Sequence, residues 1–452
     1  RIMKAQPRIL PFLFLMAVTT VRAGEALSAK ILDNELQVIV VENHTVPLVT
    51  IELIVRNGSF NEAPEENGLA NFHAHMFCKA NQAYPGPGAC LERTRELGMV
   101  TGSNVQEEWE HFFGTLPRDS LRSGLELMRQ SLLYPLFMGD ELGREKRVIL
   151  DQMDRQAATP AYHLAQALRK KLWGKNDSRK NYLGDPEVIR SVTPDQMRLI
   201  HGRYVIPNNA ALLVSGDVKP GEVFRQAREL FGDWKPGPDP SRVNPIPPMV
   251  PLPASEDTVV IQAVNNAEIV MAWHGPSVTA DVKGTFAADV FSFILNQKIS
   301  EFQKNLVDSG IALSADIIYF TQKHIGPILI SVSCRPQKFW EAYEALRAEV
   351  ERFADPGYFT DEQLANAKTL LEVDAVYRGD KASNLIHEVA FWWAVAGLDY
   401  YRDYLKNLRA VSHQDIADYV KRYIIDQPHV TAAMVSKQTQ QQLKVVEGSL
   451  TR

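Results

Sequence analysis

The sequence predicts an α+β protein made of two homologous domains, each a sheet covered by helices, joined by a proline-rich linker. Three observations support this fold class. The chain has 452 residues, which is too long for one ordinary domain. A spaced pattern of helix caps, tyrosines and strands occurs twice along it. Eight prolines gather between Pro236 and Pro253, where they block both helix and central strand and favour an extended spacer.

The repeated pattern is clearest near the end of each half. Thr193 is a natural N-cap that opens a helix, Tyr204 follows eleven residues later, and an apolar strand starts at Ala211. In the second half Ser412 opens a helix, Tyr423 again follows after eleven residues, and a strand is predicted at residues 430–435. The equal spacing indicates a duplication.

Further elements agree with this duplication. Strands are predicted at residues 36–41 and 48–55, with counterparts after the linker at 258–263 and 269–273. The acidic pairs at 140–141 and 361–362 each begin a long charged helix. Because helices come in runs and do not alternate strictly with strands, layered α+β domains are favoured. We predict an N-terminal domain at 24–235, the linker at 236–255 and a C-terminal domain at 256–452.

The first residues predict export. Lys4 and Arg8 precede an apolar run at residues 9–18, and small and polar residues lead to Ala23. The run is too short to span a bilayer, so residues 1–23 are predicted to be a secretory signal peptide cleaved after Ala23. The mature chain would then be periplasmic and would have no stable membrane span. An uncleaved anchor is the alternative.

Composition excludes one class of partner and leaves the cysteines open. A hydrophobic content of 45% and a charged content of 23% are ordinary for a globular protein. The net charge of -5 gives no basic surface, so nucleic acid is not an expected partner. In an exported protein Cys78 and Cys90 could pair and leave Cys334 free. Three buried, unpaired thiols are the equal alternative.

Residues 68–76, GLANFHAHM, have the form of a zinc-peptidase helix that lacks most of its chemistry. An inverted zinc motif carries two histidines four residues apart and a glutamate beside the second. Here Asn71 stands at the first histidine position and Ala74 at the glutamate position, so only His75 remains.

Several segments in a fixed order resemble the pitrilysin/insulinase family of zinc metallopeptidases, in its short two-domain bacterial and mitochondrial-processing-peptidase-like form. The resemblance covers almost the whole mature chain and implies two α/β-roll domains with mostly antiparallel sheets. The segments that carry it are RNGS at 56–59, GLA at 68–70, EKRVILDQM at 145–153, YVIPNNA at 204–210, SGDV at 215–218 and FGDW at 231–234.

The resemblance implies where the family's catalytic groups would fall. The metal histidines map to Asn71 and His75, the catalytic glutamate to Ala74, and the distal glutamate ligand to Gln152, whereas the supporting glutamate is kept as Glu145. Amides are poor zinc ligands, and a methyl group accepts no proton from water. Although the family would bind zinc, we expect no cofactor and no catalytic residue in this chain.

Two neighbouring groups offer alternatives. His75, Cys78 and Glu145 could form a rewritten metal site, because residues three apart share a helix face. His73 is expected to point away from His75. The acidic cluster at 107–111 is interpreted as a solvated loop, beside the strand that in this family pairs with extended peptide.

The second half also lacks the substrate-contacting residues of the family. In two-subunit members of the family, the partner subunit contributes an arginine and a tyrosine that contact substrate. Those positions map to Leu306 and Leu313, so substrate contacts of that kind are lost.

Three hypotheses for the function follow. The leading one is a catalytically inactive homologue that completes the peptide chamber of an active, zinc-bearing homologous subunit. A second is a peptide-binding or structural module without an enzyme partner. A third is an active metalloendopeptidase that uses the rewritten site.

Overall fold

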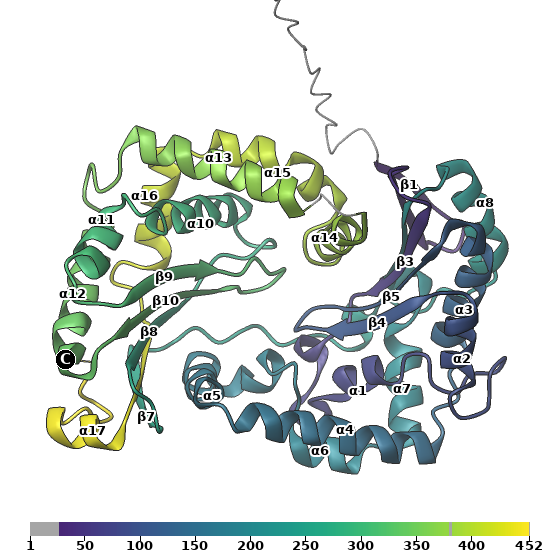
Figure 1. Ribbon diagram of the computed structural model, residues 1–452, viewed down its shortest axis with the longest axis horizontal. Coiled ribbons are helices and arrows are strands. Elements are labelled where there is room, and N and C mark those ends of the chain that lie inside the picture. Colours follow the sequence, from purple (N-terminus) through teal and green to yellow (C-terminus); the bar gives the residue numbers. More distant parts are fainter. Residues whose placement is uncertain (1–26, 379–381, 452) are drawn as a thin grey trace, which may run out of the picture.

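Two sheets, one in each half of the sequence, organise the protein (Figure 1). The computed structural model describes residues 27–378 and 382–451, so the predicted signal peptide lies outside the described residues. The first sheet has the strand order β1-β2-β6-β3-β5-β4, and the second has the order β7-β11-β8-β10-β9. The strands are β1 (Leu27–Ile31), β2 (Gln37–Glu42), β3 (Leu48–Val55), β4 (Val100–Val105), β5 (Glu110–Pro117), β6 (Ala210–Gly216), β7 (Glu256–Ile261), β8 (Ala267–His274), β9 (Ser314–Tyr319), β10 (Pro327–Cys334) and β11 (Val430–Val435).

The two sheets share one topology apart from the extra strand β1. In each, one parallel pair (β2 with β6, β7 with β11) is followed by three antiparallel pairs. The predicted α+β class with two mostly antiparallel sheets is therefore confirmed, and the duplication read from spacing appears as a repeated strand order. Thr193 and Ser412 each form a capping box at the start of a helix, as their sequence pattern indicates.

Helices cover the outer face of each sheet. The first sheet packs against α1, α3, α4, α7 and α8, and the second against α10, α12 and α16. The helices are α1 (Leu69–His75), α2 (Ala89–Glu96), α3 (Leu121–Leu133), α4 (Gly139–Ala157), α5 (Pro160–Trp173), α6 (Pro186–Ser191), α7 (Pro194–Tyr204), α8 (Pro220–Phe231), α9 (Pro240–Val243), α10 (Val282–Leu295), α11 (Glu301–Gln303), α12 (Phe339–Arg352), α13 (Asp361–Arg378), α14 (Ala382–Val395), α15 (Leu398–Ala410), α16 (His413–Tyr423) and α17 (Lys437–Leu443).

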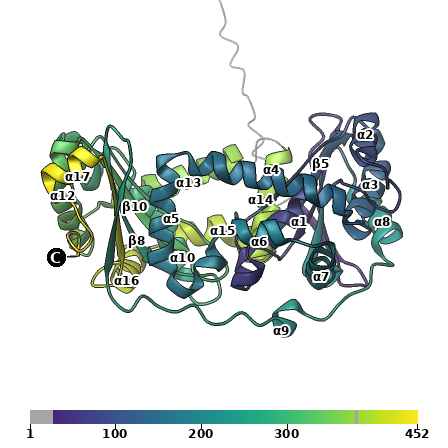
Figure 2. The same cartoon turned by 90° about the horizontal axis from the view of Figure 1, so that it is seen from below.

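The inner faces of the sheets are covered by an exchange of helices between the halves. Helix α14 comes from the second half, and its buried Ile386, Val389 and Trp393 pack on the first sheet. Helix α5 comes from the first half, and its Leu168 and Leu172 pack on the second sheet. Figure 1 shows α14 beside β3 and β5, and Figure 2 shows α5 next to β8 and β10. The apolar residues of the first inner face are Ile39, Val41, Ile54, Ala211 and Leu213, and those of the second are Val270, Ala272, Val430, Ala432 and Met434.

Polar contacts reinforce this exchange. The Arg56 guanidinium donates to the carbonyls of Trp393 and Ala394, at 3.1 and 3.3 Å, and lies 4.0 Å from the Trp393 ring. It thereby caps the C-terminus of α14, where exposed carbonyls favour a cation. On the other seam Glu108 accepts from the backbone N–H groups of Lys323 and His324, at 2.6 and 3.0 Å.

The linker at residues 236–255 runs along one side of the molecule between the halves (Figure 2). It is mostly extended, as its prolines predict, with one short turn of helix at α9 (Pro240–Val243). That turn forms because the Asp239 side chain accepts from Ser241 N–H and proline occupies the first helical position.

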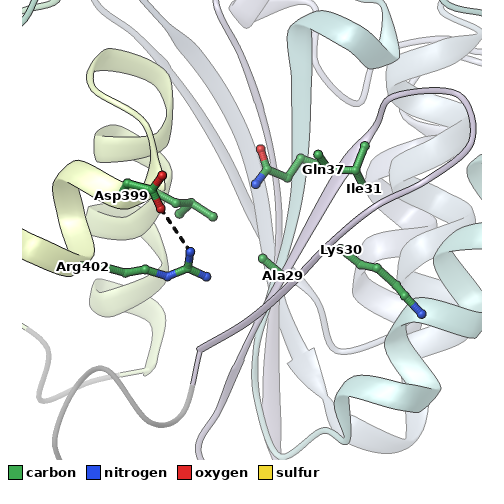
Figure 3. Close-up of a pocket in the computed structure, with 7 residues that line it drawn as sticks. Ala29, Lys30, Ile31, Gln37, Asp399 and Arg402 are labelled. Carbon is green, nitrogen blue, oxygen red and sulfur yellow. Dashed lines mark hydrogen bonds and ion pairs between the residues drawn. The ribbon is translucent and has the colours of Figure 1, made fainter.

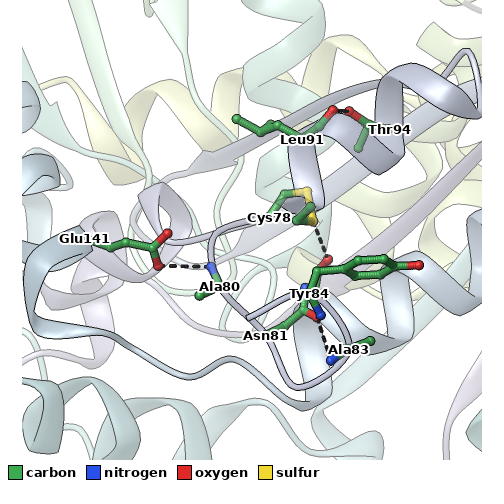
Figure 4. Close-up of a disulfide and its surroundings, with 10 residues drawn as sticks. Cys78, Ala80, Asn81, Ala83, Tyr84, Leu91, Thr94 and Glu141 are labelled. Atoms are coloured by element: carbon green, nitrogen blue, oxygen red, sulfur yellow. Dashed lines mark hydrogen bonds between the residues drawn. A yellow bond between two sulfur atoms is a disulfide. The ribbon is translucent and has the colours of Figure 1, made fainter. Parts of the chain in front are cut away.

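A disulfide joins Cys78 to Cys90, with an S–S distance of 2.05 Å (Figure 4). Cys334 is free and buried. The disulfide alternative of the sequence analysis is thus the one the structure contains. No helix within the described residues is both long enough and apolar enough to cross a membrane.

We predict that the two halves stay together after the linker is cut. A protease site inserted after Val250 should allow cleavage into two fragments that co-elute in native gel filtration, because each fragment buries a helix on the sheet of the other. The disulfide lies within the first fragment and does not join them.

The matched control carries Leu168→Asp and Ile386→Asp, which place a charge on each exchanged helix. Loss of a buried aliphatic side chain typically costs about 2–5 kcal/mol, and an unpaired buried charge costs more. The cut control should separate into fragments. Separation of the cut parent chain under native conditions would contradict the exchange.

Candidate active site

The start of helix α1 is formed by a glycine in a left-handed conformation and by the side chain of a buried glutamate. Gly68 has a φ of 109°, and an added Cβ would lie 2.9 Å from Gly184 Cα. The Glu62 carboxylate accepts from Gly68 N–H at 2.8 Å and from Ala70 N–H at 2.6 Å. The pattern of Glu62 followed by GLA therefore has a local structural reason: it closes the unsatisfied N-terminus of α1.

Two of the predicted catalytic positions on α1 hold buried residues that are fixed by hydrogen bonds to neighbouring segments. Asn71 is buried, and its side-chain amide donates to the Leu183 carbonyl at 3.1 Å. Ala74 is 3% exposed, and its carbonyl accepts from Ser103 Oγ at 2.7 Å. An amide that donates and a methyl group provide neither a metal ligand nor a proton acceptor for water.

His75 points toward α4, where it meets Glu145. Its Nδ1 lies 3.4 Å from Glu145 Oε2, and Lys79 Nζ lies 2.6 Å from Glu145 Oε1. Burial alone would raise the pKa of Glu145, but the hydrogen bonds from His75 and Lys79 hold that pKa below its ordinary value. The Lys79 ammonium therefore supplies a cation at the carboxylate that borders the predicted metal position. Gln152 lies seven residues further along α4 and is half-buried.

The alternative metal site of His75, Cys78 and Glu145 lacks its thiolate in this structure. The Cys78 sulfur is bonded to Cys90, and a disulfide sulfur is not a zinc ligand. In Figure 4 the chain after Cys78 turns toward α4, where Ala80 N–H donates to Glu141 at 3.0 Å. His75 and Glu145 are thus left as a pair supported by Lys79.

His73 points to the opposite side of α1, as expected, and joins a buried polar chain. Its Nδ1 lies 2.9 Å from Glu110 Oε2, and its Nε2 lies 3.1 Å from His201 Nδ1. Glu110 also accepts from Asn57 Nδ2 at 3.1 Å. Burial, followed by the proximity of His73, lowers the pKa of His201 to about 3.

The interpretation of residues 107–111 as a solvated acidic loop was wrong. Glu108, Glu110 and His111 are all buried, in the turn before β5 and at its start. Each carboxylate has a distant partner: Glu110 meets His73, and Glu108 meets His324 at 2.8 Å. These partners lie far away in sequence, so local composition gave no signal of them.

The strand that could pair with peptide lies at the edge of the first sheet. Strand β4 pairs with β5 and ends the strand order. Its Ser103 hydrogen bond to Ala74 fixes the strand against α1. An extended peptide could therefore add to this edge next to the predicted catalytic positions.

The two mapped positions in the second half lie in different environments. Leu306 is fully buried in the core of the second sheet, whereas Leu313 is 45% exposed just before β9. Neither side chain can replace the guanidinium or phenol that the resemblance implies.

A surface depression of about 380 Å³ lies away from these positions, between β1 and the start of α15 (Figure 3). Asp399 and Arg402 face Gln37 and Ala29 across it, and Arg402 donates to Asp399 at 3.3 Å. None of the predicted site residues lines this depression. Its lining residues are Ala29, Lys30, Ile31, Gln37, Leu398, Asp399 and Arg402.

Family profiles match both halves of the chain. The profile described as Insulinase (Peptidase family M16) matches residues 37–186, and that described as Peptidase M16 inactive domain matches residues 191–371. The chain belongs to the pitrilysin/insulinase family. Its α1 and α4 are the helices on which the sequence resemblance located the family's zinc site.

Similar proteins include several described as zinc proteases. The chain is 22% identical over 203 residues to the uncharacterized zinc protease YmxG of Bacillus subtilis, covering 45% of this chain and 49% of that protein. It is 22% identical over 394 residues to the probable zinc protease PqqL of Escherichia coli, covering 80% of this chain and 41% of PqqL. The alignments thus span less than half the length of both relatives.

Solved structures share the fold. A protease from Helicobacter pylori aligns with a TM-score of 0.79 at 20% identity, covering 90% of this chain and 99% of that one. A peptidase M16 inactive domain from Pseudomonas fluorescens aligns with a TM-score of 0.78 at 16% identity, covering 91% and 98%. The periplasmic protease PqqL aligns with a TM-score of 0.79 at 16% identity, covering 95% of this chain and 50% of that one.

The polar chain behind α1 predicts a pH dependence of stability. The pKa of His201 is about 3 in the folded protein, below the ordinary 6.5, so the unfolded state binds more protons between these values. Its contribution is complete above about pH 6.5 and decreases as the pH falls toward 3, with a slope of up to about 1.4 kcal/mol per unit.

Chemical unfolding at a series of pH values should therefore show a steeper acid loss for the parent chain than for His201→Gln. The control His413→Gln changes an exposed histidine and should keep the parent slope. Equal slopes in the parent chain and His201→Gln would contradict the buried neutral imidazole.

Proposed function

We propose that this chain is a non-catalytic member of its family that completes the peptide chamber of an active, zinc-bearing homologous subunit. The observation that carries the proposal is the chemistry of α1. The sequence resemblance assigns Asn71 and Ala74 to the positions of a metal histidine and the general base, and both residues are buried. The position that should accept a proton from water holds a methyl group.

The expected rate losses argue against peptide hydrolysis by this chain alone. Loss of a general base typically costs about two to four orders of magnitude in rate. Without a metal, the activation of water and the polarisation of the peptide carbonyl would be lost as well. Lys79 adds a further obstacle, because an ammonium paired with Glu145 repels a second cation bound next to it.

The size of PqqL supports a partner. This chain aligns with half of the PqqL chain, and the first half of PqqL, taken alone, aligns over 93% of this chain and 94% of that half. In the proposed complex, a second, zinc-bearing chain would take the place of the remaining half. Peptide would lie along the β4 edge, held by main-chain hydrogen bonds, while the partner performs the chemistry.

We further propose that the protein acts in the periplasm. The sequence of residues 1–23 has the features of a secretory signal. The disulfide Cys78–Cys90 fits an oxidising compartment. The similar protein PqqL is described as a periplasmic protease.

The purified chain alone should show no zinc-dependent peptide hydrolysis above background. The measurement is the cleavage of a mixed peptide library with added zinc, repeated with a chelator. Zinc-dependent cleavage that the chelator abolishes would reject the proposal and favour the rewritten active site.

A restored variant tests the reason for inactivity. Asn71→His, Ala74→Glu and Gln152→Glu together return the family's groups, and Lys79→Ala removes the competing cation. Metal analysis after dialysis should find one more zinc ion per chain in this variant than in the parent chain. Restoration that keeps Lys79 should bind this additional zinc more weakly. Equal zinc content in the parent and restored chains would contradict the proposal that these substitutions removed the metal site.

The partner itself is tested by isolation from native periplasm. Under the proposal, the chain co-purifies with a stoichiometric zinc-bearing homologue, and the complex cleaves peptides. The open β4 edge favours a second candidate, a peptide-binding module that needs no enzyme. Isolation of the chain with bound peptide but without a homologue would favour that module.

A further inference from the structure

A polar cluster lies on the otherwise apolar inner face of the first sheet, beneath α14. Glu52 on β3 is fully buried, and His111 on β5 is 7% exposed. His387 approaches from α14, which belongs to the second half of the chain. Three residues that are remote in sequence and come from both halves therefore meet at one point.

The contacts within this cluster are close. Glu52 Oε1 lies 2.7 Å from His111 Nδ1, and Glu52 Oε2 lies 2.5 Å from His387 Nδ1. One ligand atom from each of the three side chains lies within 4.8 Å of the others. Within the part of the chain that the structure describes, this is the one group of three histidine, cysteine, aspartate or glutamate side chains with such a geometry.

We propose that Glu52, His111 and His387 form a zinc-binding site that bridges the two halves of the chain. It is separate from the zinc position that the family resemblance locates on α1. The proposal does not rest on the proposed function, because it requires neither a partner nor a peptide.

The donor set suits zinc. Two imidazole nitrogens and one carboxylate oxygen are a set that zinc uses in proteins, with bonds of about 2.0–2.2 Å and a fourth position for water. Tetrahedral geometry at these lengths separates the donor atoms by about 3.3 Å. His111 and His387 contact different oxygens of Glu52, so the contact to the oxygen that binds the ion would open by less than about 1 Å, and the other donor atoms, all within 4.8 Å of one another, would adjust toward the same spacing.

The contacts fix which ring nitrogens would bind the metal. Nδ1 of each imidazole faces the Glu52 carboxylate. In a zinc complex each ring would carry its one proton on Nε2, and the Nδ1 lone pair would bind the ion. The carboxylate then exchanges two hydrogen bonds for one bond to a dication.

The surroundings favour a fixed ion. Aromatic rings hold the imidazoles in place: Phe113 lies 4.6 Å from the His387 ring and Trp109 lies 4.9 Å from the His111 ring, measured between centroids. These apolar walls strengthen the attraction between a dication and the carboxylate. The His387 side chain is 30% exposed, which gives water and metal a route to the cluster.

The position of the ligands gives the site a structural consequence. Two ligands stand on neighbouring strands of the first sheet, and the third stands on the exchanged helix α14. A bound ion would tie α14 to this sheet and so strengthen the connection between the halves. Zinc should therefore stabilise the folded chain as a ligand of the native state.

The test is calorimetric titration of zinc into the metal-stripped chain without a polyhistidine tag, followed by cobalt absorption spectroscopy. The parent chain should bind one zinc ion per chain. His111→Gln and His387→Gln should each weaken binding at least about 100-fold, because the donors would fall below three. Zinc should raise the melting temperature of the parent chain but not that of His387→Gln.

Two controls separate this site from its rivals. His324→Gln removes another imidazole that contacts a glutamate across the halves, and His75→Gln removes the histidine retained on α1. Both should bind zinc as the parent chain does, within about threefold. Circular dichroism checks that each variant is folded. Absence of stoichiometric binding by the parent chain would overturn the proposal, as would loss of binding in His75→Gln while His387→Gln still binds.

Discussion

Each sheet presents two apolar faces, and the helices of its own half cover only the outer one. The inner faces must also be shielded from water. In this chain α14 covers the inner face of the first sheet, and α5 covers the inner face of the second. The position of Arg56 follows from the exchange, because it caps α14 where that helix ends on the first sheet. The linker need only be long enough to let the halves meet, since the exchanged helices and not the linker fix their relative position.

The same constraint places charged groups where they need partners from the other half. Covering an inner face buries whatever that face carries, and burying an unpaired carboxylate is costly. Glu52 lies on the face that α14 covers, and α14 contributes His387 to it. Glu108 lies at the seam with the β9–β10 loop, and backbone N–H groups of that loop donate to it. Closure of the two halves therefore depends on polar matching as well as on apolar packing.

The sequence predicted features whose cause is local. Strands β2, β3 and β11 appear within one or two residues of the predicted ranges because their apolar runs are long and end at turns. The caps at Thr193 and Ser412 need only residues three positions away.

The exchange of α5 and α14 was not predicted, because an amphipathic pattern shows that a helix has a buried face but not which sheet covers it. Residues 107–111 were misjudged for the same reason: a run rich in glutamate looks solvated until its distant partners, such as His73, are known. At the candidate site, the assignment of Asn71, Ala74 and Gln152 to catalytic positions stays a prediction from the resemblance, and the ion pair of Lys79 with Glu145 was not predicted.

Lys79 neutralises a buried negative charge at the seam between α1 and α4. Glu145 is largely withdrawn from water, and a carboxylate in that position needs positive charge or hydrogen-bond donors. His75 provides one contact, and the Lys79 ammonium provides the other at 2.6 Å. The carboxylate oxygens are thus engaged by side chains of the α1 segment, and the side-chain amide of Asn71 is anchored to the Leu183 carbonyl. The contacts of Lys79 and Asn71 therefore hold the seam together, because each satisfies a polar group that packing of the helices withdraws from water.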